Sequence, residues 1–476
     1  LDNAMAWARP DFLLVNGTNV FLYPEGRSLD FPATVTVTTH PGWQVVTSMH
    51  SGGAPRTYRE ANYHDLVDMP FFIGRMDVDS AQISGKWTRF ASYPAGSFQG
   101  RMRDSLAKRI SRVIPAESAV LGETPWDTYS ILMIFDASFG GGSALEHQSS
   151  HVGVYTPFLG TPGADTILTS ITAHEIFHAW NVKRLRPADL VPYRYSASQP
   201  TTWLWVSEGI TDYYADVALA RAGVLDSTAF INAMLSNMQT VGAAPPTALE
   251  DASLSTWIHP KDGSGYIYYP KGSLTGFMLD IMIRDASDNA RSLDGVMREL
   301  YQSTYKRGRG FTGAEWWATV RQAAGGRDFA EFNARYVDGR DPYPWATVLP
   351  LAGLRYVVDS VQQARLGISS NADSTGVHVM EVTAGGVAEA AGVHVGDQLI
   401  SVGGVQVQNA AWATRFRQLY DGKVGVDVPI TVRRAGQTVS LMGKSRTVPV
   451  ANERIEFDRN ASPRAVRIRN GIIRGS

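Results

Sequence analysis

The chain contains no cysteine among its 476 residues. Disulfide bonds, thiolate metal ligands and a cysteine nucleophile are therefore excluded, although this absence assigns no compartment. No run approaches the 18 consecutive apolar residues that indicate a membrane-spanning helix. The net charge of −1 leaves no basic field, so we expect no nucleic-acid partner.

The chain is instead long and rich in apolar residues. With 44% hydrophobic and 10% aromatic residues it can bury large cores, and its length predicts two to four domains. It begins LDNAMAWARP, without an initiator methionine, a basic n-region or an apolar h-region, so we expect a processed or truncated start.

The order of the predicted elements indicates a multidomain α+β protein. Residues 1–75 are β-rich and resemble a partial β-sandwich, with a hairpin expected at Asn16-Gly17. Residues 76–345 form a second domain, with a strand at 129–136 followed by helices. These helices are expected at 166–184, 201–224, 271–287, 292–305, 313–325 and 328–339.

The C-terminal part of the chain is again β-rich. The Pro-rich stretch 342–353 is predicted to be a linker. Residues 350–448 carry glycine at short intervals and form a further domain, and residues 449–476 form a basic, polar tail.

The stretch TAHEIFHAWNVKRLRP carries a metal-binding pattern. Four residues turn an α-helix by 400°, so His174 and His178 lie about 40° apart on one face. Both imidazoles can then reach one ion, while Glu175 is suited to act as a general base. The alternative is a chance set of three polar residues, but the apolar neighbours of the motif predict a buried helix, in which these groups need partners.

A catalytic zinc site normally has a third protein ligand. In WVSEGITDYYADV, Glu208 lies 30 residues after His178 on a predicted helix, and Asp212 follows on the same face. We expect Glu208 to complete the coordination and Asp212 to accept the second N–H of a ligating histidine. The alternative is a capping carboxylate with a solvated aspartate, which the apolar surroundings disfavour.

HEIFH followed by SEGITDYY resembles the gluzincin metallopeptidases, the thermolysin-like group with two His and one Glu. Within that group, HAWNVKRLRP together with WVSEGITDYYAD is similar to the bacterial glycyl aminopeptidase family. The resemblance implies one Zn²⁺ per chain, peptide substrates with a free N-terminus, and a preference for glycine or alanine as first residue. It also implies a periplasmic or secreted bacterial protein.

Two further sites follow from the resemblance. Gluzincin aminopeptidases often carry a Gly-Ala-Met-Glu-Asn motif whose Glu binds the substrate amine, and residues 143–147 match it in the Ala and in Glu146. They also carry a Tyr-x-Lys-Gly motif, whose Tyr hydroxyl donates a hydrogen bond to the developing oxyanion. Tyr269 matches this Tyr, and the nearby Tyr266 and Tyr268 are alternative candidates for the role. Alternatively, Glu146 is a surface residue on a Gly-rich loop, and the tyrosines are aromatic residues packed in the core. Trp180 and Asn181, just past the metal motif, are candidate residues of the pocket for the first side chain, although a buried Trp is more often part of the packing.

TGVHVMEVTAGGVAEAAGVHVGDQLISVGGVQV resembles a PDZ domain. Its carboxylate-binding loop would contain Leu366, Gly367 and Ile368, and a peptide C-terminus would bind beside it. The alternative is a closed β-module that binds nothing.

We therefore predict a zinc aminopeptidase. Two other functions remain open at this stage: an endopeptidase whose PDZ domain delivers substrate, and a peptide-binding scaffold without activity. The intact set of His174, Glu175, His178 and Glu208 counts against the scaffold, which has no need of a base.

Overall fold

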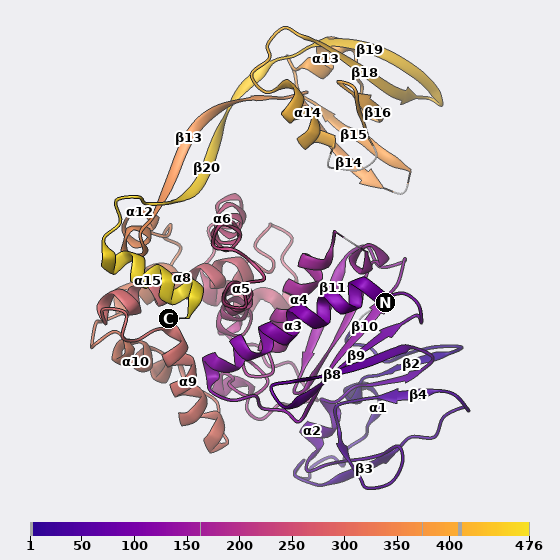
Figure 1. Cartoon of the computed structure of the whole chain (residues 1–476), viewed down its shortest axis with the longest axis vertical. Helices are drawn as coiled ribbons and strands as arrows, with labels where there is room; N and C mark the ends of the chain where they lie inside the picture. The colour runs from indigo at the N-terminus through magenta and orange to yellow at the C-terminus, as the bar shows by residue number, and fades with distance from the viewer. Residues whose placement is uncertain (1–2, 162, 374, 408–411, 476) are drawn as a thin grey trace. The chain divides into compact units, whose positions relative to one another are not determined.

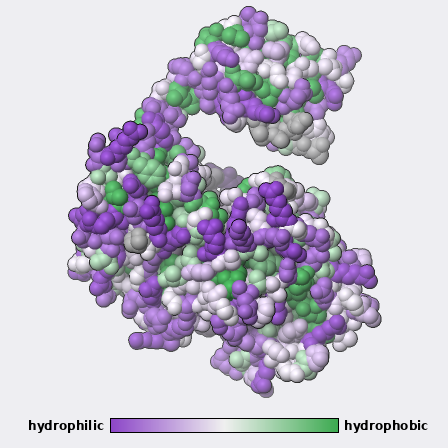
Figure 2. Space-filling view, viewed as in Figure 1, coloured by the Kyte–Doolittle hydropathy of each residue, from purple (hydrophilic) through white to green (hydrophobic). Residues whose placement is uncertain are grey.

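The computed structural model describes residues 3–161, 163–373, 375–407 and 412–475 (Figure 1). The chain divides into two compact units, and the second is inserted into the first. Residues 1–355 and 457–476 form unit 1, and Tyr356–Glu456 form unit 2. None of the helices within these ranges is both long and apolar enough to cross a membrane. Hydrophilic residues cover most of the visible surface of each unit, with hydrophobic residues in small groups between them (Figure 2).

The N-terminal part of unit 1 contains two antiparallel sheets. One has the order β1-β2-β7-β4 and the other β3-β6-β5. The strands are β1 Trp7–Arg9, β2 Phe12–Val15, β3 Ala33–Thr36, β4 Gln44–Val46, β5 His50–Ser51, β6 Thr57–Glu60 and β7 Phe71–Gly74. Two short helices, α1 Gly17–Val20 and α2 Tyr63–Val67, complete this part.

The hairpin predicted at Asn16-Gly17 is wrong. Strand β2 pairs with β1 and β7, and Gly17 begins helix α1. A Cβ atom on Gly17 would lie 2.5 Å from the Cα of Val67, so the glycine permits close contact between α1 and α2.

A five-stranded mixed sheet forms the centre of unit 1, in the order β11-β12-β10-β9-β8. The three inner strands are parallel, and the edge strands β11 and β8 are antiparallel to their neighbours. Their bounds are β8 Asp77–Ile83, β9 Lys86–Tyr93, β10 Thr128–Phe135, β11 Gly142–His147 and β12 Ser150–Tyr155. Leu132 and Val152 on one face pack against Phe12 and Phe72 of the N-terminal part. Helix α3, Gly100–Leu121, packs against α4, Asp165–Phe177, and α5, Ile210–Arg221 (Figure 1).

Most residues of α8 are buried, and several of the other helices of unit 1 pack against it. The longer ones are α4 Asp165–Phe177, α5 Ile210–Arg221, α6 Ser227–Ala243, α7 Leu249–Ser255, α8 Tyr268–Ala286, α9 Leu293–Ser303 and α10 Gly313–Ala323. π-Helical segments occur at Trp205–Gly209 and at Asn333–Val337, the latter after the short α11 Ala330–Phe332. The predicted linker 342–353 instead contains α12 Trp345–Val348 and a 3-10 turn at Leu349–Ala352.

Unit 2 begins and ends with a two-stranded ribbon of β13 and β20. Its sheet has the order β14-β15-β16-β18-β19, with β17 beside β16. The strands are β13 Leu354–Ala364, β14 Ile368–Asp373, β15 Gly376–Val382, β16 Gln398–Val402, β17 Val405–Gln406, β18 Asp427–Arg434, β19 Gln437–Lys444 and β20 Thr447–Phe457. Helices α13 Val387–Ala391 and α14 Trp412–Tyr420 cover it, and Trp412 and Phe416 contribute to its core.

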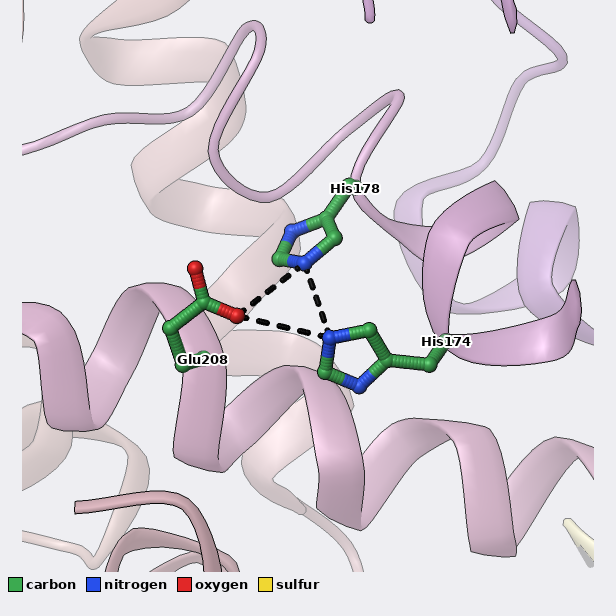
Figure 3. A group of neighbouring side chains, drawn as sticks. All are labelled: His174, His178 and Glu208. Carbon is green, nitrogen blue, oxygen red and sulfur yellow. Dashed lines mark hydrogen bonds and ion pairs between the residues drawn. The ribbon is translucent and has the colours of Figure 1, made fainter. Parts of the chain in front are cut away.

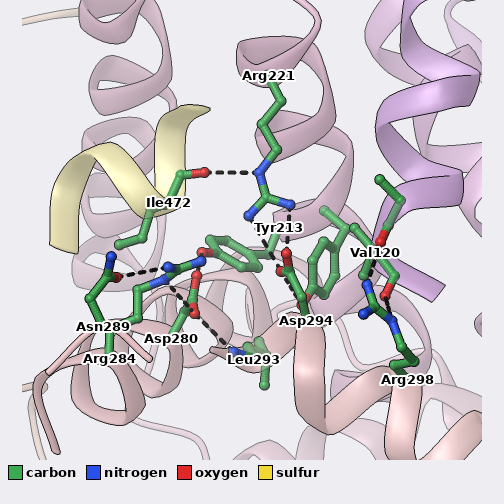
Figure 4. Close-up of polar contacts among 12 residues, drawn as sticks. Val120, Tyr213, Arg221, Asp280, Arg284, Asn289, Leu293, Asp294, Arg298 and Ile472 are labelled. Carbon is green, nitrogen blue, oxygen red and sulfur yellow. Dashed lines mark hydrogen bonds and ion pairs between the residues drawn. The ribbon is translucent and has the colours of Figure 1, made fainter. Parts of the chain in front are cut away.

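The segment predicted as a tail is largely ordered structure. Its first residues belong to β20, and Pro463–Arg474 form helix α15, which returns to unit 1 and packs on α5 and α8. Arg221 of α5 donates to the Ile472 carbonyl oxygen and pairs with Asp294 at 2.8 Å (Figure 4). Although the tail is basic and polar in composition, its helix α15 has an apolar face formed by buried residues such as Ile468.

Candidate metal centre and active site

Helix α4 ends at the predicted metal motif. His174 lies in its last turn and His178 is its C-cap residue. Their Nε2 atoms lie 2.9 Å apart, and the Glu208 Oε2 atom lies 3.4 Å and 3.2 Å from them (Figure 3). A tetrahedral ion with ligand distances of about 2.0–2.1 Å holds its ligand atoms roughly 3.3 Å apart. The three donor atoms therefore have the separations that one such ion requires.

The Nδ1 atoms of both imidazoles face oxygen atoms of the protein. His178 Nδ1 donates to the Asn181 carbonyl oxygen at 2.7 Å, and His174 Nδ1 lies 2.6 Å from Asp212 Oδ1. In the neutral state that metal ligation requires, a ring with its proton on Nδ1 directs its Nε2 lone pair at the other ring and at Glu208. Three acceptors that converge in this way repel one another unless a cation lies between them. The residues present thus fit a divalent metal of the zinc type.

Glu208 lies on the π-helical segment Trp205–Gly209, directly before α5. Burial opposes ionisation of its carboxyl, but His178 and His174 outweigh burial and lower its pKa below the usual range. π-helical turns occur frequently at functional sites because they re-aim single side chains. The sequence predicted one uninterrupted helix here, since the apolar spacing of 201–224 carries no signal of a wider turn.

Glu175 is buried beside the histidines. Its Oε2 atom accepts no hydrogen bond from any residue that the structure describes. Burial raises the pKa of Glu175 to about 7, while His174 and His178 act in the opposite direction. A carboxyl group whose pKa lies near neutrality can both accept and return a proton.

Strand β11 brings Glu146 to this site. It is an edge strand, and Glu146 stands opposite His151 of β12. One carboxylate oxygen of Glu146, one of Glu175 and a ring nitrogen of His178 lie within 4.8 Å of one another. A residue 28 positions before the metal motif thus places a further carboxyl group beside Glu175.

Tyr269 is the member of the predicted tyrosine group whose ring contacts the metal motif. Its ring centroid lies 5.9 Å from that of His174. Burial raises the pKa of Tyr269, and Glu208 adds to this, so the hydroxyl stays protonated and able to donate. Tyr268 instead approaches Thr256 through its hydroxyl at 3.2 Å, and Tyr266 is 60% exposed.

Two glycines set the distance between Glu208 and Tyr269. A Cβ on Gly272 would lie 2.7 Å from the Trp205 carbonyl oxygen and 2.9 Å from the Gly209 Cα atom. Helix α8 therefore packs against the π-helical segment with backbone in contact. The Lys-Gly of the tyrosine motif and the Glu-Gly of the ligand motif are the sequence signals for this contact.

The Asn181 side chain is engaged by hydrogen bonds in the protein interior. It is buried, and its amide donates to the Val206 carbonyl oxygen at 2.8 Å and to Thr211 Oγ1 at 3.0 Å. Because its own carbonyl oxygen accepts from His178, Asn181 ties the metal helix to the segment that carries Glu208. Sequence reasoning missed this role.

The predicted carboxylate-binding loop of unit 2 lines a groove of about 490 Å³. Gly367 has φ +81° and lies against Gly386, where a side chain would be strained. Leu366 and Ile368 flank it in the groove. The remaining lining includes apolar and cationic side chains, among them Trp412, Phe416, Arg365, Arg417 and Arg446.

Three family models match the chain. M61 glycyl aminopeptidase matches residues 168–275, and the peptidase M61 N-terminal domain matches residues 1–75. A PDZ domain model matches residues 357–433. These matches confirm the predicted resemblance to the glycyl aminopeptidase family and the predicted PDZ domain. No curated protein sequence matches the chain.

Solved structures are similar to the chain to different extents. An aminopeptidase N family protein from Idiomarina loihiensis has a TM-score of 0.74 at 21% identity, over 97% of this chain and 83% of that chain. An M1 zinc metallopeptidase from Deinococcus radiodurans has a TM-score of 0.49 at 16% identity, over 71% and 72%. Native yeast LTA4 hydrolase has a TM-score of 0.48 at 16% identity, over 70% and 51%.

Proposed function

We propose that the chain is a zinc-dependent aminopeptidase, because the M61 glycyl aminopeptidase model and the peptidase M61 N-terminal model both match it. Its substrates are peptides with a free N-terminus, and it releases a small first residue, glycine or alanine. One zinc ion per chain would be held by His174, His178 and Glu208.

The observation that carries this proposal is the position of Glu146. A peptidase that acts on any internal bond needs no negative charge beside its base. The free α-amine of a peptide has a pKa of about 7.7–8.0 and is mostly cationic at neutral pH. A carboxylate within 4.8 Å of the Glu175 carboxylate can pair with that amine and place the first peptide bond at the metal centre.

Each residue of the site has its own role in the proposed reaction. Bound zinc supplies a Lewis acid and lowers the pKa of water at the site. Glu175 takes a proton from the attacking water and delivers it to the leaving nitrogen. The Tyr269 hydroxyl donates to the carbonyl oxygen as negative charge develops there. Asp212 and the Asn181 carbonyl oxygen hold the two imidazoles in their ligating tautomers.

Hydrolysis of free and blocked substrates tests the proposal. We expect glycyl- and alanyl-p-nitroanilide to be cleaved and their N-acetylated forms to be left intact. Removal of metal with a chelator should abolish the activity, and zinc should restore it. Cleavage of the blocked substrates at similar rates would instead identify an endopeptidase, and no cleavage by zinc-loaded protein would identify a scaffold.

A second proposal concerns unit 2. We infer that its groove binds the carboxyl terminus of a peptide, because Leu366, Gly367 and Ile368 line it together with arginine side chains. Binding of a fluorescent peptide with a free carboxyl terminus, compared with its C-terminal amide, tests this. Equal affinity for the two peptides would contradict it.

A further inference from the structure

A buried ion pair lies close to the proposed amine-binding residue. Lys183 follows the metal motif, and its Nζ atom lies 2.8 Å from Asp68 Oδ1. The Lys183 side chain is 8% exposed and that of Asp68 is 20% exposed. Asp68 is the C-cap residue of α2, so a residue of the N-terminal part neutralises a cation of the catalytic part.

The same carboxylate holds the strand that carries Glu146. Asp68 Oδ2 accepts from the Gln148 backbone N–H at 2.9 Å, and Asp68 Oδ1 lies 3.3 Å from His147 Nδ1. Both residues follow Glu146 directly, at the turn between β11 and β12. Asp68 therefore contacts the end of β11 and Lys183 at once.

The Lys183 ammonium group can compete with the substrate amine for the Glu146 carboxylate. Burial opposes the charge of Lys183, but Asp68 outweighs burial and raises the pKa of the ammonium, and Glu146 contributes in the same direction. Burial also opposes ionisation of Asp68, yet Lys183 and His147 lower its pKa to about 2. Both members of the pair are thus charged at neutral pH, and Asp68 links Lys183 to the two residues that follow Glu146.

We propose that Asp68 is a positioning residue that keeps Glu146 available for the substrate α-ammonium by neutralising Lys183. This inference rests on the proposed function. Without the Asp68 carboxylate, the Lys183 charge would act on Glu146 uncompensated and would repel a second ammonium group at the same site. A neutral N-terminus would not experience that repulsion.

Steady-state kinetics of Asp68→Asn test the inference. We expect KM for alanyl-p-nitroanilide to rise roughly tenfold or more, with a smaller change in kcat, because ammonium binding is weakened and the metal ligands are untouched. The double variant Asp68→Asn/Lys183→Met removes both charges and should restore KM to near the wild-type value, since a pair replaced by neutral side chains leaves no uncompensated charge.

Asp294→Asn is the matched control. The Asp294–Arg221 pair has the same 2.8 Å separation and similar exposure, 19% and 8%. Its loss should lower the melting temperature about as much as Asp68→Asn does, but leave KM unchanged. If the double variant stays as impaired as Asp68→Asn, or if Asp294→Asn raises KM equally, Asp68 acts only through stability and the inference is overturned.

Binding of L-alaninol separates this inference from the proposed function. Alaninol carries the amine but no bond to cleave, and calorimetry measures its affinity without turnover. We expect Asp68→Asn and Glu146→Gln to weaken binding, the double variant to restore it, and N-acetyl-alaninol to bind none of them. Alaninol binding in this pattern without hydrolysis would reject the aminopeptidase and retain the role of Asp68. Unchanged binding by Asp68→Asn would reject that role alone.

Discussion

At the scale of single residues, the site depends on neighbours that perform different tasks. His174 and Glu175 are adjacent in the chain, but one helical step of 100° directs the first to the metal centre and the second to the space beside it. The raised pKa of Glu175 suits a proton carrier, while Glu208, held ionised by the histidines, suits a ligand.

The Glu175→Gln variant is expected to lose proton transfer while it keeps metal binding. The amide cannot accept the proton, so kcat should fall by about 10²–10⁴-fold. The zinc content, measured on the purified protein, should remain at the wild-type level because Glu175 does not ligate. Loss of zinc together with activity would show that Glu175 supports the metal itself.

Tyr269→Phe tests the hydroxyl group alone. We expect kcat to fall by about 10²-fold with little change in KM, because the donor acts on charge that develops in the transition state. Tyr266→Phe is the control, since that side chain is 60% exposed and should leave kcat unchanged. A fall in kcat for Tyr266→Phe but not for Tyr269→Phe would show that Tyr266 is the donor to the oxyanion.

How far the sequence predicts the site depends on whether its geometry is local. His174 and His178 share a helix face by their spacing alone, so their meeting is predictable. Asn181 is different. Its role depends on the turns that follow Phe177 and on contact with Thr211, and neither leaves a periodic signal in the sequence.

At the scale of elements, the contact between α8 and the π-helical segment determines how Tyr269 is positioned relative to Glu208. The sequence predicts both helices, because their apolar residues recur at helical spacing, but the π turn and the backbone contact depend on tertiary packing. Gly209 and Gly272 allow this contact, and through it the helix of Tyr269 is positioned against the segment of Glu208.

Gly272→Ala should disturb this contact. Its Cβ would lie 2.7 Å from a carbonyl oxygen that cannot move freely, so we expect a loss of about 1–3 kcal/mol in stability and weaker zinc binding. Competition with a chromogenic chelator measures the second effect. Gly295→Ala in α9, where no atom lies within 4 Å of the added Cβ, should retain zinc affinity and stability. Equal behaviour of the two variants would contradict this account.

At the scale of the whole molecule, unit 2 is an insertion, and the chain closes unit 1 after leaving it. The Asp458 N–H donates to the Gly353 carbonyl oxygen at 2.9 Å, so entry and exit are adjacent. The sequence predicted a tail because 449–476 is basic and polar. The spacing of Ile468 and Ile472, one helical turn apart and both buried, is the signal of α15.

Two truncations distinguish an insertion from a terminal domain. Replacement of residues 356–456 by a short Gly-Ser turn should leave unit 1 folded, with alanyl-p-nitroanilide hydrolysis near the wild-type rate, because α15 keeps its contacts with α5. Truncation after Glu456 removes α15 with its buried isoleucines, each worth about 1.5–3 kcal/mol, and should markedly lower the melting temperature. A stable protein after the second truncation would show that α15 is dispensable.

The central claim is that Glu146 makes this metallopeptidase an aminopeptidase. The most direct measurement is the ratio of kcat/KM for alanyl-p-nitroanilide to that for N-acetyl-alanyl-p-nitroanilide, in wild type and in Glu146→Gln. The account predicts a large ratio in wild type that falls at least about tenfold in the variant, with zinc content unchanged. A ratio that is the same in both proteins would contradict the assignment of Glu146 and, with it, the proposed reaction.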